Sequence, residues 1–203
     1  MTAWSEISAV AAAAPYPVEV LPVDPERAAA CLSALGITTG SWLGAVVATS
    51  GGLVLDHGWL RVLGGGHDRL PDVAAHLAPE TGRLVVAFDV MGGQFAWMPP
   101  EPGARPTVHY FGPDDLAWQD LELGYGEWLE AMLSGAMTQF YAGLRWPGWE
   151  TEVAGAGLDQ GISTWPPPWT IEGKDLSAVS RTVIPLAELV SVHEDAARQL
   201  GPG

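Results

Sequence analysis

The chain has 203 residues, in which 24 carboxylates outnumber nine lysine and arginine side chains and give a formal charge of −15. This charge argues against nucleic acid and against an anionic membrane surface as partners, because both are bound by clustered basic side chains. Apolar residues make up 48% of the chain and ten residues are tryptophan, which excludes disorder as the overall state. Because no linker interrupts the sequence, we expect one globular domain over residues 1–203.

The cellular compartment is predicted from the N-terminus and from the cysteine count. Cys31 is the only cysteine, so an internal disulfide and a thiolate zinc site are excluded. Residues 1–14 contain no lysine or arginine, and Glu6 interrupts them, which is not the pattern of a secretory signal. The longest apolar runs are far shorter than the roughly 20 residues that span a bilayer. We therefore expect a cytoplasmic protein that does not enter a membrane.

The first part of the chain predicts a pair of helices within residues 3–36. Apolar residues recur at helical spacing over residues 4–11. In the second helix, Asp24-Pro25 supplies an N-cap and a first-turn proline, and Gly36 stands where a helix C-terminus favours glycine. Both ends of the second helix are therefore predicted by residue chemistry as well as by periodicity.

The next part, about residues 43–121, predicts an antiparallel sheet of about six strands. Between Leu43 and Leu63, short runs rich in valine, leucine and tryptophan are separated by glycines, a pattern that favours strands and tight turns. Further strands are predicted at residues 84–90, 94–98, 107–111 and 117–121.

The C-terminal part, residues 124–200, predicts helices and loops rich in tryptophan and proline. An apolar stripe from Tyr125 to Leu133 predicts one helix, and a second short helix is expected at residues 137–144. Residues 145–175 show no period and are expected to be irregular. Pro185 is placed to begin a last helix whose inward side chains include Leu200. Because helices and strands are segregated along the chain, the fold class is predicted to be α+β, with helices flanking the sheet.

No motif specifies phosphate or covalent chemistry. Gly64-Gly65-Gly66 and the glycines at 155–161 lack the spacing and the lysine of phosphate-binding loops. No serine stands in a Gly-x-Ser-x-Gly turn, and Cys31 has no basic neighbour to activate it. We therefore assign no catalytic residue, cofactor or metal ligand, and favour a non-catalytic protein while leaving the question of enzyme activity open.

Two pairs of aspartate and histidine form an alternative ligand site. Asp56-His57 and His67-Asp68 flank one predicted strand, and Asp89 is expected near the same edge of the sheet. Imidazole and carboxylate groups suit general-base chemistry or a hard metal ion. Full extension would separate the two histidines by about 30 Å, so only the Gly64–Gly66 turn could bring them together.

Tryptophans of the C-terminal half predict a partner-binding surface. Four of them stand beside prolines or glycines in irregular chain, where a tryptophan either fills the base of a loop or forms an interface. Two nearby glutamates would share one face of an extended strand. The candidate partner-binding residues are Trp146, Trp149, Trp165, Trp169, Glu150 and Glu152.

Several long stretches carry a family resemblance. They are GGLVLDHGWLRVLGGGHDRLP, LVVAFDVMGGQFAW, VHYFGPDDLAWQDLELGYGEWLEAMLSG and QFYAGLRWPGWETEV, with PVEVLP near the start and EGKD near the end. In these stretches the chain resembles, nearly end to end, a bacterial family of unknown function, the domain-of-unknown-function family numbered 2625. The resemblance implies no activity and no catalytic residues.

A second likeness concerns the order of elements. VAFDVMGGQFAW, TVHYF and YGEWLEAML follow one another as a glycine-bearing strand pair, an aromatic-ending strand and an amphipathic helix. This order is similar to that of the SUKH superfamily of α+β proteins, many of which resemble immunity proteins that neutralise bacterial toxins. The likeness implies a SUKH-like fold and a toxin as partner, and the acidic charge of the chain favours a basic protein in that role.

Two functions of different classes follow from these observations. The first is a non-catalytic protein-binding module of the immunity-like kind, because an acidic surface speeds association with a basic partner. The second is a small-ligand binder or metal-dependent enzyme that uses the aspartates and histidines around Gly64–Gly66. A homodimer formed through the apolar helix stripe or the loop tryptophans is a third, plainer alternative.

Overall fold

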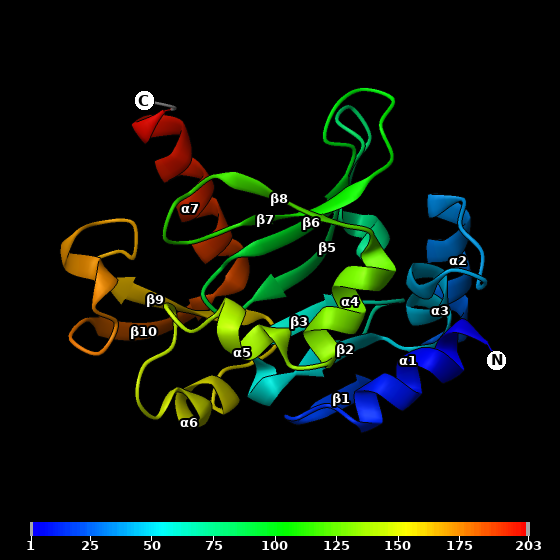
Figure 1. Cartoon of the computed structure of the whole chain (residues 1–203), viewed down its shortest axis with the longest axis horizontal. Coiled ribbons are helices and arrows are strands. Elements are labelled where there is room, and N and C mark those ends of the chain that lie inside the picture. The colour runs from blue at the N-terminus through cyan, green and yellow to red at the C-terminus, as the bar shows by residue number, and fades with distance from the viewer. Residues whose placement is uncertain (1, 202–203) are drawn as a thin grey trace.

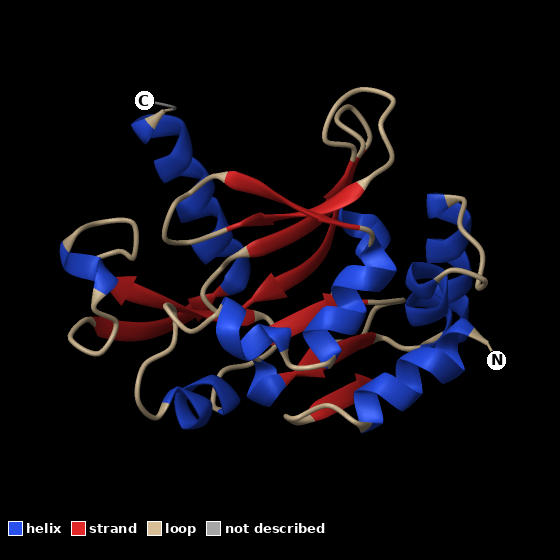
Figure 2. Ribbon diagram, viewed as in Figure 1, coloured by secondary structure: helices blue, strands red, loops and turns tan. Residues whose placement is uncertain are grey.

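The computed structural model describes residues 2–201, in which a large antiparallel sheet is flanked by helices (Figure 1, Figure 2). The predicted α+β class is confirmed. The helices are α1 (Ala3–Ala12), α2 (Pro25–Leu35), α3 (Trp42–Thr49), α4 (Tyr125–Leu133), α5 (Ala136–Phe140), α6 (Trp149–Ala154) and α7 (Leu186–Leu200). The strands are β1 (Val18–Leu21), β2 (Gly52–Leu55), β3 (Leu60–Leu63), β4 (Leu77–Ala78), β5 (Arg83–Asp89), β6 (Gln94–Met98), β7 (Thr107–Phe111), β8 (Trp118–Leu123), β9 (Gln160–Trp165) and β10 (Ser180–Pro185). Short 3₁₀ turns are η1 (Asp56–Gly58), η2 (Val73–His76) and η3 (Glu172–Lys174).

The large sheet has eight strands rather than about six. Its order is β1-β2-β3-β5-β6-β7-β8. Strand β4 pairs with the first residues of β5, and β3 pairs with the last residues of β5. The extra strands are β1 and the two-residue β4, which are too short to show an alternating pattern in the sequence. Strands β9 and β10 form a separate two-stranded ribbon.

The predicted strand at the start of the 43–63 region is wrong, because these residues form helix α3. Ser41 caps the helix by accepting a hydrogen bond from the Gly44 amide at 3.1 Å. Leu43 to Val47 are all buried, so this helix has no polar face and hence no period of 3.6 residues. A short run that is apolar throughout looks the same in a buried helix and in a buried strand.

The 145–175 region, predicted to be irregular, contains helix α6 and strand β9. The predicted last helix is present as α7, but Leu200 is 65% exposed rather than inward. Leu200 stands in the last turn of α7, whose C-terminal end projects beyond the sheet in Figure 1. Tertiary contacts, rather than the apolar pattern, therefore decide which part of this helix is buried.

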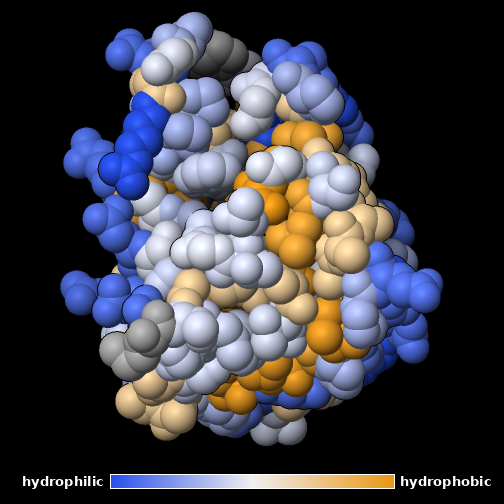
Figure 3. All heavy atoms as spheres, turned by 90° about the vertical axis from the view of Figure 1, so that its right-hand side faces the viewer, coloured by the Kyte–Doolittle hydropathy of each residue, from blue (hydrophilic) through white to orange (hydrophobic). Residues whose placement is uncertain are grey.

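The helices are divided between different sides of the sheet. Helices α1–α3 gather near the N-terminus, whereas α7 lies beside the β9–β10 ribbon (Figure 2). Helix α4 covers one face of the sheet, where the ring of Trp128 lies 5.1 Å from that of Phe95. On the side of the molecule formed by the N-terminal helices, hydrophobic side chains make a band between hydrophilic ones (Figure 3).

A buried carboxylate fixes the turn between β5 and β6. Asp89 is 0% exposed and accepts hydrogen bonds from the hydroxyls of Tyr110 at 2.8 Å and Tyr141 at 3.2 Å. Its Oδ1 atom also accepts from the amides of Met91 at 2.9 Å and Gly93 at 2.8 Å. Burial raises the pKa of Asp89, and these four hydrogen bonds oppose that rise. A Cβ atom on Gly93 would lie 2.1 Å from Oδ2, so the turn requires glycine there.

The variant Asp89→Asn tests whether this carboxylate holds the turn. The amide side chain presents one acceptor oxygen and one donor group, so some of the four donors would lose their acceptor. We expect the free energy of unfolding to fall by about 2–4 kcal/mol. Urea denaturation followed by tryptophan fluorescence measures the change, with the exposed Asp68→Asn as control. Equal stability of the two variants would contradict a central role for Asp89.

Candidate functional site

The β9–β10 ribbon stands apart from the large sheet and is the candidate interaction surface. Its strands pair from Gln160 opposite Pro185 to Trp165 opposite Ser180. One backbone hydrogen bond, from the Ile162 amide to the Val90 oxygen at 2.7 Å, joins the ribbon to the β5–β6 turn. Packing against α7 covers part of the ribbon, and Ile162 is buried in the joint.

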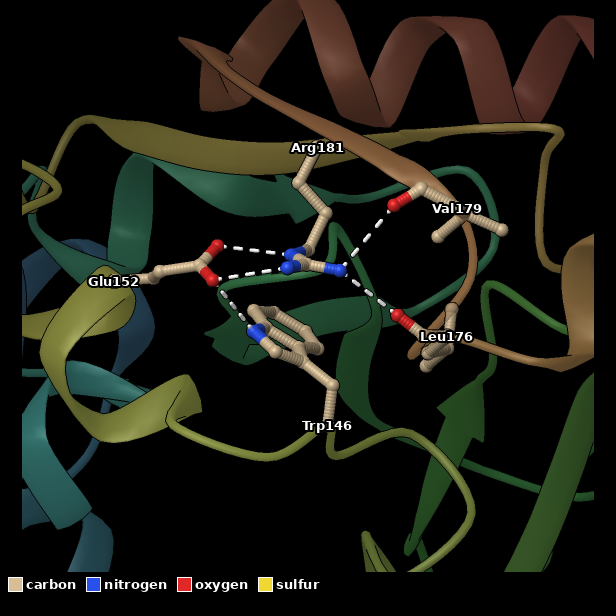
Figure 4. A network of polar contacts seen from close by, with 5 residues as sticks. All are labelled: Trp146, Glu152, Leu176, Val179 and Arg181. Carbon is tan, nitrogen blue, oxygen red and sulfur yellow. Dashed lines mark hydrogen bonds and ion pairs between the residues drawn. The ribbon is translucent and has the colours of Figure 1, made fainter.

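An arginine of β10 links the ribbon to α6. Nε and Nη2 of Arg181 donate to the two carboxylate oxygens of Glu152 at 2.9 and 3.0 Å, a bidentate ion pair (Figure 4). Nη1 donates to the backbone oxygens of Leu176 at 2.9 Å and Val179 at 3.3 Å. One guanidinium group therefore joins a helix, a strand and the loop that precedes the strand.

Trp146 completes this network. Its Nε1 donates to Glu152 Oε1 at 3.1 Å, and the guanidinium of Arg181 lies 4.9 Å from the centre of its indole ring (Figure 4). Hydrogen bonds from Arg181, together with the one from Trp146, hold the pKa of the Glu152 carboxyl below its ordinary value. The carboxylate thus stays charged in the folded protein to a lower pH than an ordinary glutamate does.

The loop between β9 and β10 has a defined backbone shape. The Thr170 hydroxyl donates to the Pro167 oxygen at 2.7 Å and accepts from the Gly173 amide at 3.1 Å. A Cβ atom on Gly173 would lie 1.8 Å from the Pro167 oxygen, so this close approach requires glycine. Trp169 packs edge-on against His193 of α7 with ring centres 5.4 Å apart, and burial lowers the pKa of His193 to about 4, which keeps the imidazole neutral near pH 7.

Two large apolar side chains remain exposed at the loop end of the ribbon. Trp165 is 72% exposed and Ile171 is 87% exposed, the two highest values among the exposed large hydrophobic residues of the described chain. The packing of Trp169 and the hydrogen bonds of Thr170 hold the loop that carries them. The structure therefore presents apolar groups to solvent from a fixed backbone.

The predicted partner-binding residues fall into two groups. Trp146 and Trp149 are 2% and 9% exposed and pack in the core, where Trp149 lies 5.0 Å from the ring of Trp59. Glu152 is bonded to Arg181, and Trp169 is half-buried. Trp165, Glu150 and Glu152 are exposed, although the ion pair with Arg181 holds Glu152. The buried members position the ribbon, whereas the exposed members are available for contact.

The β2–β3 hairpin lies between the two halves of the predicted Asp/His site. Asp56 and His57 lie at its turn, next to the Leu55–Leu60 pair, whereas His67 and Asp68 follow the other end, where Gly52 pairs with Leu63. The Gly64–Gly66 turn therefore does not bring the two histidines together. Within residues 2–201, no group of three histidine, cysteine, aspartate or glutamate side chains is arranged to hold a metal ion.

Two members of that site do share one end of the sheet, but each has structural partners. Asp89 pairs across the sheet with Leu60 and is held by two tyrosines, as described above. Asp56 forms a 2.6 Å ion pair with Arg145, and the guanidinium of Arg145 lies 4.1 Å from the ring centre of Trp149. Both carboxylates are buried, so neither faces an open cavity as a free base would.

Sequence reasoning missed Arg181 and Ile171. Arg181 is 29 residues from Glu152, in a strand that the sequence pattern did not reveal, so no local signal joined the two. Ile171 lies in a region without a period, so its sequence context does not show whether the side chain is buried or exposed. The exposure of Ile171 and the bonding of Arg181 become visible only once the ribbon is formed.

The variant Glu152→Gln tests the link between the ribbon and α6. We expect it to lower the free energy of unfolding by about 1 kcal/mol at pH 7 and to speed hydrogen exchange of the β9–β10 amides. Because the folded-state pKa of Glu152 is depressed, the ion pair stabilises the protein above the ordinary glutamate pKa. That stabilisation is lost as the pH falls through the depressed value, so the difference between wild type and variant should shrink as the pH is lowered below the ordinary glutamate pKa.

The exposed neighbour Glu150 supplies the control, since Glu150→Gln should change neither stability nor exchange. Urea denaturation at several pH values and exchange measured by mass spectrometry give the two readouts. A stability difference for Glu152→Gln that does not shrink as the pH is lowered would contradict this role of the ion pair.

No helix in residues 2–201 is long and apolar enough to cross a membrane.

Comparison with known proteins places the chain in a family. The chain is 39% identical over 177 residues to an uncharacterised protein of Escherichia coli strain K12, YbfG, covering 84% of this chain and 81% of that protein. It is 33% identical over 162 residues to an uncharacterised protein of Haemophilus influenzae, covering 75% and 71% of the two chains. The model of the family described as "Protein of unknown function DUF2625" matches residues 1–189, and the chain therefore belongs to this family.

Proposed function

We propose that this chain is a non-catalytic, cytoplasmic protein-binding module that contacts its partner with the loop end of the β9–β10 ribbon. The observation that carries the proposal is the exposure of Trp165 (72%), the last residue of β9, and of Ile171 (87%) in the loop of fixed shape that follows. Tryptophan is among the residues that contribute most to protein interfaces, because it buries a large rigid surface. A loop that is already ordered loses little conformational entropy when it binds.

Charge supports a basic protein as the partner. The formal charge of the chain is −15, and Glu172 and Asp175 of the ribbon loop and Glu150 of α6 are exposed. An acidic surface attracts a basic protein over distances of about a Debye length and raises the rate of association. In this proposal, carboxylates guide the encounter and the two apolar side chains supply the buried contact.

The immunity-like version of the proposal makes the partner a basic toxin that is neutralised by binding. The likeness of the element order to that of the SUKH superfamily supports this version, since many members of that superfamily resemble immunity proteins. Binding alone suffices for neutralisation, so the version needs no catalytic residue in this chain.

The double variant Trp165→Ser/Ile171→Ser tests the proposal. We expect the protein to keep its circular dichroism spectrum, because both side chains are largely in solvent. Affinity capture at low salt from the cells that produce the protein should recover a basic partner with the wild type. The variant should bind that partner at least about tenfold more weakly, and higher salt should slow association.

The control is Val20→Ser/Val192→Ser, which removes two apolar side chains that are 45% and 46% exposed outside the ribbon. Affinity of the purified partner for the three proteins is measured by surface plasmon resonance. Equal affinity for the ribbon variant and the control would contradict the assigned surface. A wild type that is a dimer by light scattering, with a monomeric ribbon variant, would show that the ribbon binds a second copy instead.

A further inference from the structure

A groove separates α7 from the large sheet, on the face opposite α4. Trp128 of α4 packs on Phe95, and neighbouring strand residues point to opposite faces, so Gln94 lies on the far face. Gln94 pairs with Phe88 of β5, and both line the groove. Its first part encloses about 450 Å³ between α7, η2 and the β4–β5 edge, within the usual range of small-molecule sites.

The groove continues past a charged junction. Its second part, about 460 Å³, runs toward Phe111 and Trp118 and shares Arg83, Gln94 and Glu194 with the first part. The walls of the first part are mostly apolar and include Leu70, Ala75, Val85, Phe88, Leu186 and Val190. A molecule at this junction would thus place an apolar body in the first part and its polar groups beside Arg83 and Glu194; Arg198, which lines the second part, is paired with Asp195.

Arg83 differs from most other cations of this acidic chain. Four of the nine, Arg27, Arg145, Arg181 and Arg198, form ion pairs with carboxylates, and Arg61 is bonded to backbone oxygens. Arg83 forms no ion pair within residues 2–201, although it is partly buried, and its buried Nε has no hydrogen-bond acceptor there. Its guanidinium is held only over the ring of Trp118, at 5.5 Å from the centre. Its Nε is thus free to donate to an acceptor from outside the chain.

Glu194 is the matching anion. It accepts a hydrogen bond from the Gln94 side chain at 3.2 Å and forms no ion pair within the described part of the chain, with Arg83 or with any other residue. Two opposite charges therefore line the same groove without neutralising each other. The other titratable groups of the first part are Asp159, which is exposed, and His76, whose pKa is lowered by burial.

We propose that this groove binds a small apolar zwitterion, a hydrophobic amino acid or a short apolar peptide. Its carboxylate would bind the Arg83 guanidinium, its ammonium group would bind Glu194, and its side chain would lie against the apolar wall. Arginine binds carboxylates in a planar, two-pronged geometry that neutral donors do not match. This site is distinct from the ribbon surface and goes beyond the proposed protein-binding role.

Titration with leucine and with leucyl-leucine tests the proposal and distinguishes the two sources of the zwitterion. Binding is followed by nuclear magnetic resonance, with the Gln94 side-chain amide as a reporter inside the groove. We expect saturable shifts of this signal with one of the two probes. N-acetyl-leucine, which lacks the ammonium group, and leucinamide, which lacks the carboxylate, should each bind at least about tenfold more weakly.

Variants identify the residues responsible. Arg83→Met should weaken binding of the zwitterion about tenfold but leave the affinity for leucinamide unchanged. Glu194→Gln should weaken binding of the zwitterion about tenfold but leave the affinity for N-acetyl-leucine unchanged. Ala187 is an exposed residue of α7 that lines the groove, so Ala187→Trp should fill the space and abolish binding. Arg69→Met and Ala142→Trp, both at exposed positions outside the groove, are the matched controls.

Absence of a saturable shift with both leucine and leucyl-leucine would overturn the proposal. Equal binding of the zwitterion and its two singly charged analogues would overturn it as well, as would binding that survives Ala187→Trp. None of these variants touches Trp165 or Ile171, so failure here leaves the test of the ribbon unaffected.

Discussion

The carboxylate of Asp89 is the group on which the arrangement of the molecule depends. It is fully buried at the end of β5, where two hydroxyls and two amides donate hydrogen bonds to its oxygens and offset the cost of burying a polar group. The next residue, Val90, donates its amide hydrogen to the Trp59 oxygen at 2.8 Å and accepts from the Ile162 amide at 2.7 Å. The turn ordered by Asp89 therefore joins the large sheet to the ribbon.

Arginines make the other internal joints of this acidic chain. Arg61 is 0% exposed and donates to the Gly58 oxygen at 3.1 Å and the Leu158 oxygen at 3.2 Å, which ties the β2–β3 hairpin to the segment before β9. Burial lowers its pKa to about 10, so the group keeps its charge near pH 7. Arg145 and Arg181 join distant segments in the same way, through Asp56 and Glu152. Arg83 differs from these joints because, within residues 2–201, it is partly buried and forms no ion pair.

Helix α7 connects the ribbon and the groove. His193 packs against Trp169 of the ribbon loop, while the next residue, Glu194, faces the groove. Successive helix residues are about 100° apart around the axis, so one turn of α7 serves both surfaces. The position of this helix thus sets both the presentation of the ribbon and the width of the groove.

The sequence by itself determined the elements whose signals are local. Asp24 caps α2 and Gly36 ends it with a φ of 62°, and the predicted bounds of β6 and β7 match the structure. Tertiary structure alone decided that α3 is a helix and not a strand, that the β9–β10 ribbon forms, and which tryptophans are buried. An apolar run has no period when it is buried on all sides, and a tryptophan beside a proline has the same local pattern in a core as on a surface. Which of these residues reaches solvent depends on partners far along the chain, such as Arg181 for Glu152 and Trp59 for Trp149, and a local pattern carries no information about them.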